Sequence, residues 1–221
     1  MNVTVYVVQP SYPVGSVFCS GITTIVNDVT NPYTGKTWMD RNLGASQVAT
    51  SSTDVAAYGD LYQWGRRSDG HQCRNSVTTA TLSSTNTPSN GNYISSPSSP
   101  WDWRSPQNTN LWQGVFGVNN PCPSGYRLPT NTELNTEYLS WVEAPINSTN
   151  TSDGAYSSPL KLPLAGGRSS SGSLLSVGGF GNYWSSSISS TSSILLTFSS
   201  SVTNMNNNRR ANGNSIRCIK N

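Results

Sequence analysis

Charged side chains are scarce in this chain of 221 residues. Asp, Glu, Lys and Arg together make up 10% of the sequence, against about 25% in an ordinary globular domain. Hydrophobic residues are also few, at 34%, although the chain contains seven Trp and ten Tyr. Few charges, many hydroxyl and amide groups and many aromatic rings predict a loop-rich protein that is located outside the cytosol.

Acidic residues are absent after Asp153. The charged residues that follow are six Lys and Arg, so residues 154–221 carry a net charge of +6 and the preceding residues carry −3. No basic cluster is larger than a pair such as Arg209-Arg210, whereas a nucleic-acid-binding surface needs a denser basic stripe. We expect no nucleic-acid partner.

The run of about 18 apolar residues that a membrane-spanning helix needs is also absent, and we expect no membrane insertion. The first residues lack the basic region and cleavage site of a signal peptide. Val3, Val5 and Val7 alternate with other residues there, which predicts a strand. Either an export signal lies outside this sequence, or the protein reaches the outside as part of a particle.

Catalytic motifs are missing. The chain has one histidine, His71, in a turn-like polar setting, and we expect it to be exposed to solvent. There is no phosphate-binding glycine loop, no GxSxG motif and no DxDxDG calcium loop. We expect no catalytic residue, no metal ligand and no cofactor, with a structural calcium ion held by loop carbonyl oxygens left as an open alternative.

Four cysteines occur, and no two of them have CxxC spacing: Cys19, Cys73, Cys122 and Cys218. With one histidine they make a poor zinc set. In extracellular-looking sequence, cysteines favour disulfides, and free buried thiols are the alternative.

The order of predicted elements indicates an α+β fold with an antiparallel sheet. Two strands joined by a turn at residues 31–36 are followed by a helix over residues 54–64, with Ala57, Leu61 and Trp64 on one face and Gly59 inside it. The long polar stretch 66–121 comes next, and we expect four aromatic residues to hold it against the core: Trp101, Trp103, Trp112 and Phe116.

A second helix begins at a capping box formed by Thr130 and Glu133. We expect Pro145 to prevent its continuation. Its predicted apolar face consists of Leu134, Tyr138, Trp141 and Val142. Short strand candidates then occupy residues 160–166, 182–186, 194–199 and 215–220.

Four segments, at residues 56–66, 121–130, 182–186 and 210–218, resemble the Fibrobacter succinogenes major paralogous domain in their order and spacing. The resemblance covers about residues 22–221. It implies a C-type-lectin-like fold, with two helices packed on short antiparallel sheets, long irregular loops and a relation in fold to formylglycine-generating enzymes. Residues 1–21 would then be an N-terminal strand or extension, and residues 22–221 a single ligand-binding domain.

The resemblance also implies residue roles. It pairs Cys122 with Cys218 and leaves Cys19 and Cys73 without an assigned partner. The structural core would include Trp64, Trp141 and Trp184, buried and close together. The chain departs from the family in carrying its helix Trp at position 141 instead of near Asn135. It also lacks the EPN or QPD triplet of sugar-binding calcium lectins and a recognisable motif for the reactive cysteines of the enzymes.

The same domain type serves as the variable protein of diversity-generating retroelements, which substitute adenines. An AAC codon for Asn changes to codons for Ser, Thr or Ile in this way, and these four residues dominate positions 187–214. Ordinary low-complexity loop sequence is the alternative explanation.

Residues 187–214 are predicted to display a ligand-binding face on a packed strand. Ile194, Leu196 and Phe198 alternate on one side, and polar residues alternate on the other. The predicted ligand-binding residues are Ser187, Ser189, Ser190, Ser192, Ser193, Thr197, Ser199, Ser201, Thr203, Asn204, Asn206, Asn207, Asn208, Asn212 and Asn214. The predicted anchoring residues are Tyr183, Arg209 and Arg210.

The hypothesis that follows is a non-enzymatic receptor-binding protein on a phage particle, with a protein or glycan ligand on a cell surface. A bacterial surface adhesin or lipoprotein is the alternative, and a formylglycine-generating type of enzyme or a structural assembly module ranks lower. The oligomeric state is left open.

Overall fold

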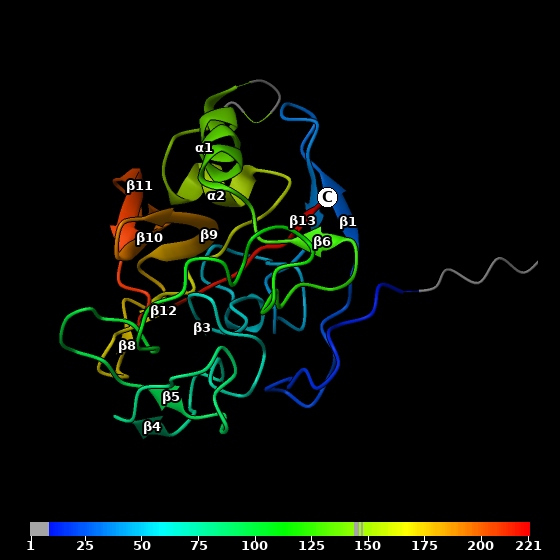
Figure 1. The fold of residues 1–221 in the computed structure, drawn as a ribbon. Helices are drawn as coiled ribbons and strands as arrows, with labels where there is room; N and C mark the ends of the chain where they lie inside the picture. The colour runs from blue at the N-terminus through cyan, green and yellow to red at the C-terminus, as the bar shows by residue number, and fades with distance from the viewer. Residues whose placement is uncertain (1–8, 144–145, 147) are drawn as a thin grey trace, which may run out of the picture.

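The computed structural model describes residues 9–143, 146 and 148–221. The strand expected at Val3, Val5 and Val7, and the role given to Pro145, lie outside the described residues. Within them the chain forms thirteen short strands, two α-helices and two 3-10 helices, joined by long loops (Figure 1). The predicted α+β class is confirmed at this level.

The first sheet joins both ends of the described chain. Its order is β1 (Asp28–Thr30), β2 (Thr37–Met39), β13 (Ile219–Lys220) and β6 (Tyr126–Arg127). β1 and β2 form the predicted antiparallel pair around the turn at residues 31–36. The last strand inserts between β2 and β6, so that Ile219 lies opposite both Trp38 and Arg127.

The second sheet carries the polar C-terminal tract. It is antiparallel, in the order β11 (Thr203–Asn208), β10 (Ser192–Phe198) and β9 (Gly181–Ser189). The β9–β10 register shifts between Ser193 and Leu195. The strict alternation predicted for this strand is therefore wrong at one position, because Leu195 and Leu196 are both buried whereas Ile194 is only half-buried.

Two further sheets are present. One has the order β3 (Tyr62–Gln63), β12 (Gly213–Asn214), β7 (Gly167–Arg168) and β8 (Leu174–Leu175). The other is a parallel pair of β4 (Thr78–Thr79) and β5 (Tyr93–Ile94). Figure 1 shows their strands β4, β5 and β8 toward the end of the molecule opposite the two α-helices.

Helix α1 (Asn131–Leu139) begins at the predicted capping box, in which Thr130 and Glu133 satisfy each other's amides. It continues into the 3-10 helix η2 (Ser140–Val142). Leu134 and Trp141 are buried as predicted, but Val142 is exposed. Helix α2 (Ser152–Ser157) was not expected from the sequence; its N-cap is Thr151, whose side chain accepts the Asp153 amide.

The helix predicted over residues 54–64 is wrong. Only a single 3-10 turn, η1 (Val55–Ala57), forms after the Asp54 cap. Gly59 then adopts a positive φ of 66°, and a Cβ there would lie 2.3 Å from the Leu43 carbonyl oxygen. A glycine-only backbone at this point turns the chain out of the helix and into the β3 strand.

The strand predicted over residues 160–166 is also wrong. Leu160, Leu162 and Leu164 are buried as an apolar alternation requires, but residues 160–165 form no strand and Gly166 makes only an isolated bridge to Gly181. Lys161 has a positive φ of 45°, and Pro163 has no amide hydrogen to donate.

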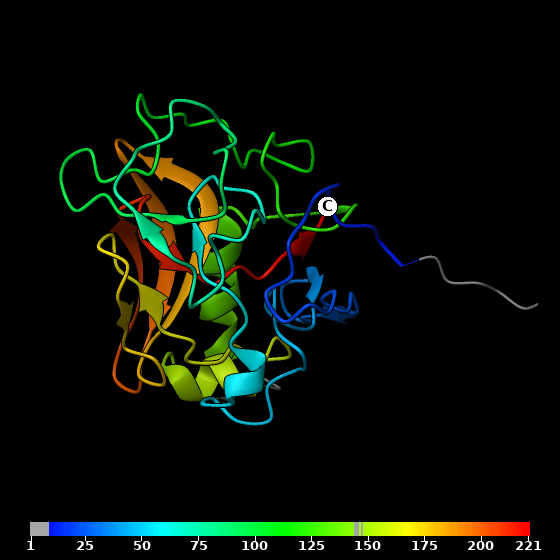
Figure 2. The same ribbon diagram turned by 90° about the horizontal axis from the view of Figure 1, so that it is seen from below.

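The β9–β10 sheet is buried on both sides at its centre. Successive residues of a strand point to opposite faces, so Trp184 packs with Trp64 in one core cluster and Tyr183 packs with Trp141 in another. All three predicted structural Trp are buried, but the expectation that they lie close together fails for Trp141. Figure 2 shows α1 packed along one face of this sheet. Trp141 belongs to the cluster that contains Tyr183, and Trp64 belongs to the other cluster.

The long loop 66–121 is held by buried indoles. Trp103 donates its Nε1–H to the Trp64 carbonyl oxygen (2.7 Å), and Trp112 donates to that of Asn119 (3.0 Å). Trp101 is half-buried, and Phe116 is 96% exposed. The predicted anchoring is therefore correct for Trp103 and Trp112 and wrong for Phe116.

Two disulfides close the structure. The predicted pair Cys122–Cys218 is confirmed, and the bridge lies in the Trp64/Trp184 cluster. Cys19 and Cys73, which had no assigned partner, form the second bridge. It ties residues 9–21 to the loop that follows β3, while the predicted domain boundary at residue 22 stays a prediction.

Candidate functional site

The predicted display residues fall into three classes of exposure. Five of them are exposed: Ser190, Ser201, Asn204, Asn206 and Asn207. Seven are half-buried: Ser187, Ser189, Ser192, Thr197, Thr203, Asn208 and Asn212. Three are buried: Ser193, Ser199 and Asn214.

The three buried residues were predicted to be exposed, and that prediction is wrong. Ser193 lies in the middle strand between Ile188 and Asn208 of its neighbours. Ser199 follows the last residue of β10, and its carbonyl oxygen accepts the Ser152 amide at the start of α2. Asn214 belongs to β12, which pairs with β3. The burial of these side chains depends on contacts between segments that are distant in sequence. A local alternation of polar and apolar residues does not predict such contacts.

Two of the three predicted anchors are also buried. The Tyr183 ring stacks on Phe198, and its hydroxyl donates to the Pro163 carbonyl oxygen. Arg210 lies over the Trp64 ring and is fully buried. Both are structural and cannot reach a ligand at the surface. Arg209 is exposed, with its guanidinium 4.4 Å from the centroid of the Trp101 ring.

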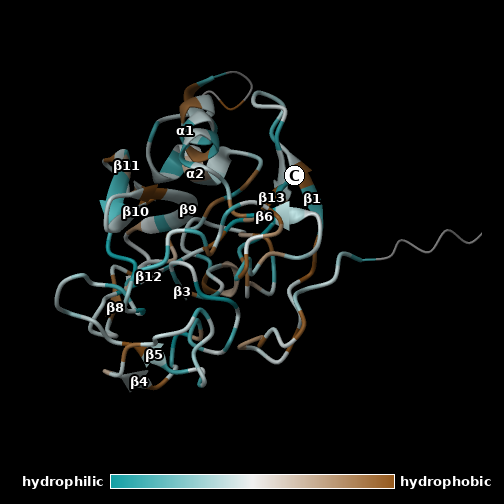
Figure 3. Cartoon of the chain, viewed as in Figure 1, coloured by the Kyte–Doolittle hydropathy of each residue, from teal (hydrophilic) through white to brown (hydrophobic). Residues whose placement is uncertain are grey.

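β11 is the free edge of its sheet. Figure 3 shows this strand largely in the hydrophilic colour. Asn204, Asn206 and Asn208 lie opposite Thr197, Leu195 and Ser193, so they share one face, on the side of Trp184.

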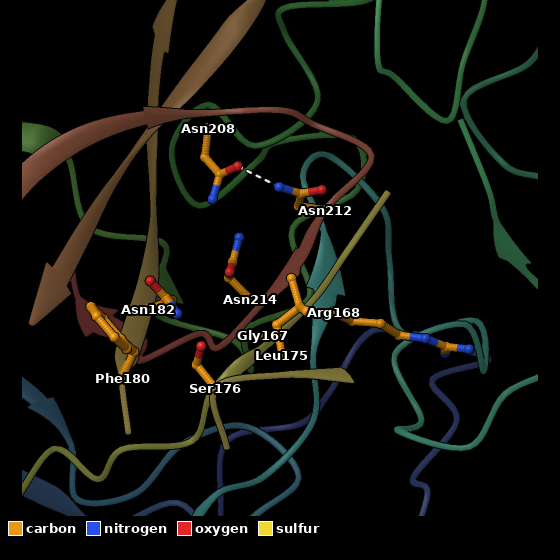
Figure 4. Close-up of a pocket in the computed structure, with 9 residues that line it drawn as sticks. All are labelled: Gly167, Arg168, Leu175, Ser176, Phe180, Asn182, Asn208, Asn212 and Asn214. Carbon is orange, nitrogen blue, oxygen red and sulfur yellow. Dashed lines mark hydrogen bonds between the residues drawn. The ribbon is translucent and has the colours of Figure 1, made fainter. Parts of the chain in front are cut away.

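A pocket of about 220 Å³ opens where the end of β11 meets the β12–β7–β8 sheet (Figure 4). We call it the amide pocket, because four of its nine lining residues are asparagines. Its lining residues are Gly167, Arg168, Leu175, Ser176, Phe180, Asn182, Asn208, Asn212 and Asn214.

The amide groups in the pocket have defined orientations. Asn212 donates its side-chain N–H to Asn208 Oδ1, which also accepts the Arg209 amide. This fixes the Asn208 side chain with its Nδ2 turned toward the pocket (Figure 4). Asn182 Oδ1 accepts from the Thr197 hydroxyl at 2.8 Å. The side-chain Nδ2 of Asn214 is buried and has no hydrogen-bond partner.

The pocket carries no free charge. Arg168 is its one charged lining residue, and the Arg168 guanidinium points away from the pocket in Figure 4. That guanidinium donates to the carbonyl oxygens of Gly172, Cys73 and Ser76. The surfaces left for a ligand are amides, one hydroxyl, and the half-exposed side chains of Leu175 and Phe180.

Sequence reasoning found three pocket residues, Asn208, Asn212 and Asn214, and missed the others. Asn182 had a usable signal, because it precedes Tyr183-Trp184 and must share a strand face with Trp184. Ser176 and Phe180 had none, since they lie in a loop that only the pairing of β7 with β8 brings to this place.

The expected exposure of His71 is wrong. His71 is fully buried, and burial lowers its pKa to about 4. Its Nε2 accepts the Gln63 amide, and its Nδ1 contacts Asp69. With both ring nitrogens engaged inside the protein, His71 is a structural residue.

Among the residues that the structure describes, no three His, Cys, Asp or Glu side chains gather into a group that could hold a metal ion. No helix in the described part is long and apolar enough to cross a bilayer. Searches for known relatives found no matching family model, no matching curated protein and no matching solved structure.

Proposed function

We propose that this chain is an extracellular ligand-binding protein with a C-type-lectin-like fold, which displays a variable Ser/Thr/Asn face on a phage particle and binds a receptor on a cell surface. The observation that supports the proposal is that residues 181–214 combine buried apolar residues, which hold the sheet, with exposed polar residues. Large apolar side chains fix the sheet, whereas the side chains of Asn204, Asn206 and Asn207 on its edge strand are exposed.

This arrangement allows the exposed residues to vary in sequence while the fold stays constant. Exposed sites tolerate substitution within about ±0.5 kcal/mol, whereas the Trp184 and Phe198 sites do not. Two disulfides agree with an oxidising location. The resemblance to retroelement-diversified domains gives the polar composition a genetic cause. A bacterial surface adhesin or lipoprotein would use the same face, and the genes beside this one would separate the two.

Whole-cell binding tests the function. The fluorescently labelled chain is incubated with a panel of bacterial strains and measured by flow cytometry, with heat-unfolded chain as the control. We expect saturable binding to a subset of strains. Absence of binding to every strain, with the chain folded, would contradict the proposal.

Sequencing tests the diversification. The locus should carry a reverse transcriptase gene and a template repeat that matches the codons for residues 182–218. In a growing population, substitutions should fall on adenines in codons such as those of Asn204 and Asn206 and spare the codons of Trp184 and Cys218, which contain no adenine. A locus without these elements would leave the binding function standing but remove the variable face.

A further inference from the structure

We propose that the amide pocket is a binding subsite for one neutral pyranose ring of a glycan. This inference rests on the proposed function, because it names the chemical class that the displayed surface recognises. The pocket has a mixed polar and apolar lining, an unpartnered side-chain amide and no charged group directed toward a ligand.

The side-chain amide of Asn214 lacks a hydrogen-bond acceptor among the described residues. Asn214 is 3% exposed, and the unpartnered atom is its Nδ2. A buried amide without a hydrogen bond destabilises the folded chain, and a ligand that supplies the missing acceptor removes that cost. Figure 4 shows this nitrogen directed into the pocket and toward the Asn208 side chain. A ligand oxygen placed between the two amides would accept from both.

The polarity of the lining matches that of sugar hydroxyl groups. Asn208 and Asn214 present N–H donors, and the Ser176 hydroxyl both donates and accepts. Sugar hydroxyl groups also donate and accept, so adjacent hydroxyls on one ring match such a mixed set. Leu175 and Phe180 supply an apolar wall, against which the C–H face of a pyranose can pack. A site of this kind combines apolar walls with a few oriented polar groups.

The charge of the lining decides between neutral and charged sugars. No carboxylate of the described residues lines the pocket, and the Arg168 guanidinium is engaged with backbone oxygens elsewhere. A phosphorylated or acidic sugar would be desolvated there without an opposite charge, which is costly. The neutral class is therefore favoured.

The volume of the pocket limits the size of the ligand. A volume of about 220 Å³ is below the roughly 300–1,000 Å³ of sites for drug-sized ligands, so the pocket suits a single ring. Gly167 keeps the floor open, because a Cβ at this position would lie 3.0 Å from Asn214 Oδ1 and 3.7 Å from Asn182 Nδ2. One ring in one shallow pocket binds weakly, and the adjoining edge of β11 and Arg209 would contact the rest of the glycan.

The test titrates the folded chain with methyl glycosides of glucose, galactose, mannose, N-acetylglucosamine and glucuronic acid, followed by saturation-transfer NMR and calorimetry. We expect at least one neutral glycoside to bind with a millimolar dissociation constant. Asn208→Ala removes a donor and Gly167→Ala fills the floor, and each should weaken binding at least tenfold. Asn212→Ala, which frees the Asn208 amide, should weaken binding by a smaller factor.

The matched control is Asn135→Ala, which removes an amide from helix α1, outside the pocket. It should leave glycoside binding unchanged. The inference is overturned if no neutral glycoside saturates the chain, if the glucuronide binds best, or if binding survives both Asn208→Ala and Gly167→Ala. Circular dichroism of each variant shows that the fold is intact.

Cell binding separates this inference from the proposed function. Saturable binding to cells without binding of any glycoside overturns the pyranose subsite and leaves the receptor-binding function standing. Loss of both overturns both. Glycoside binding without cell binding supports the subsite and counts against the cell-surface receptor.

Discussion

The guanidinium carbon of Arg210 lies 4.7 Å from the centroid of the Trp64 ring. Arg210 also donates to the carbonyl oxygens of Ser190 and Ser192 at the β9–β10 turn, and lies 3.8 Å from the Asp102 carboxylate. One buried cation thus joins the core, the display sheet and the long aromatic loop. The neighbouring Arg209 is exposed on Trp101, so two adjacent residues of the same type have opposite roles.

Arg210→Ala should lower the free energy of unfolding by about 2–4 kcal/mol, because a desolvated cation–π contact and several charged hydrogen bonds are lost together. Arg209→Ala is the matched control and should change stability by no more than about 0.5 kcal/mol. Urea unfolding of the two variants measures both values. Equal effects would contradict the structural role given to Arg210.

The two disulfides should be separable by their effect on stability. Replacing Cys122 and Cys218 by Ala opens a closure of 96 residues, which costs about 4–5 kcal/mol on the chain-entropy model. The Cys122–Cys218 bridge is also packed in the core, so its loss should exceed that of the Cys19–Cys73 bridge, which closes 54 residues. Denaturant unfolding of the two double variants compares them, and mass spectrometry of unreduced peptides checks the pairing. Mixed pairing, or a larger loss at Cys19–Cys73, would contradict this account.

Signals confined to a few residues were sufficient to predict part of the fold. The capping box at Thr130 and Glu133 and the turn at residues 31–36 depend on neighbours in sequence, and both are confirmed. The strands around Tyr183 and Leu196 were also predicted, since apolar residues recur there.

Features that depend on distant contacts were not predictable. Gly59 ends a helical pattern because its backbone meets Leu43, and no local rule contains that contact. The burial of Asn214 depends on pairing with Tyr62, 152 residues away. The amide pocket gathers residues from five segments, so the individual asparagines were found but their assembly was not.

Stability should depend on pH through Asp60. Burial raises the pKa of the Asp60 carboxyl to about 7, whereas the unfolded chain has a pKa of about 3.9. The folded state then holds a proton that the unfolded state has released between about pH 4 and pH 7. The contribution of Asp60 to stability is full below about pH 4 and is lost as the pH rises through 7.

Asp60→Asn removes this loss. The free energy of unfolding of the variant, minus that of the unchanged chain, should therefore rise between pH 4 and pH 8 by up to about 4 kcal/mol. Urea unfolding at intervals of one pH unit measures the difference. The control is Asp54→Asn: hydrogen bonds from the Thr50 amide and the Gln47 side chain lower the pKa of Asp54 to about 2. Its difference should stay constant above pH 5, and a flat Asp60→Asn curve would contradict the prediction.

The last prediction separates the scaffold from the display face within one sheet. Ser201, Asn204, Asn206 and Asn207 are exposed and should be replaceable by Ala together with little change in melting temperature, since each exposed site contributes within about ±0.5 kcal/mol. Trp184→Ala, on the same sheet, should cost about 3–5 kcal/mol, because it removes a fully buried ring and its hydrogen bond to the Tyr62 carbonyl oxygen. Thermal unfolding followed by circular dichroism measures both variants, and flow cytometry with the panel of bacteria measures binding by the fourfold variant. We expect the fourfold variant to fold normally and to lose binding or to bind a different set of strains.

If the fourfold variant unfolds, these polar residues contribute to the stability of the fold. If it folds and binds the same strains with the same affinity, the ligand contacts another surface of the domain.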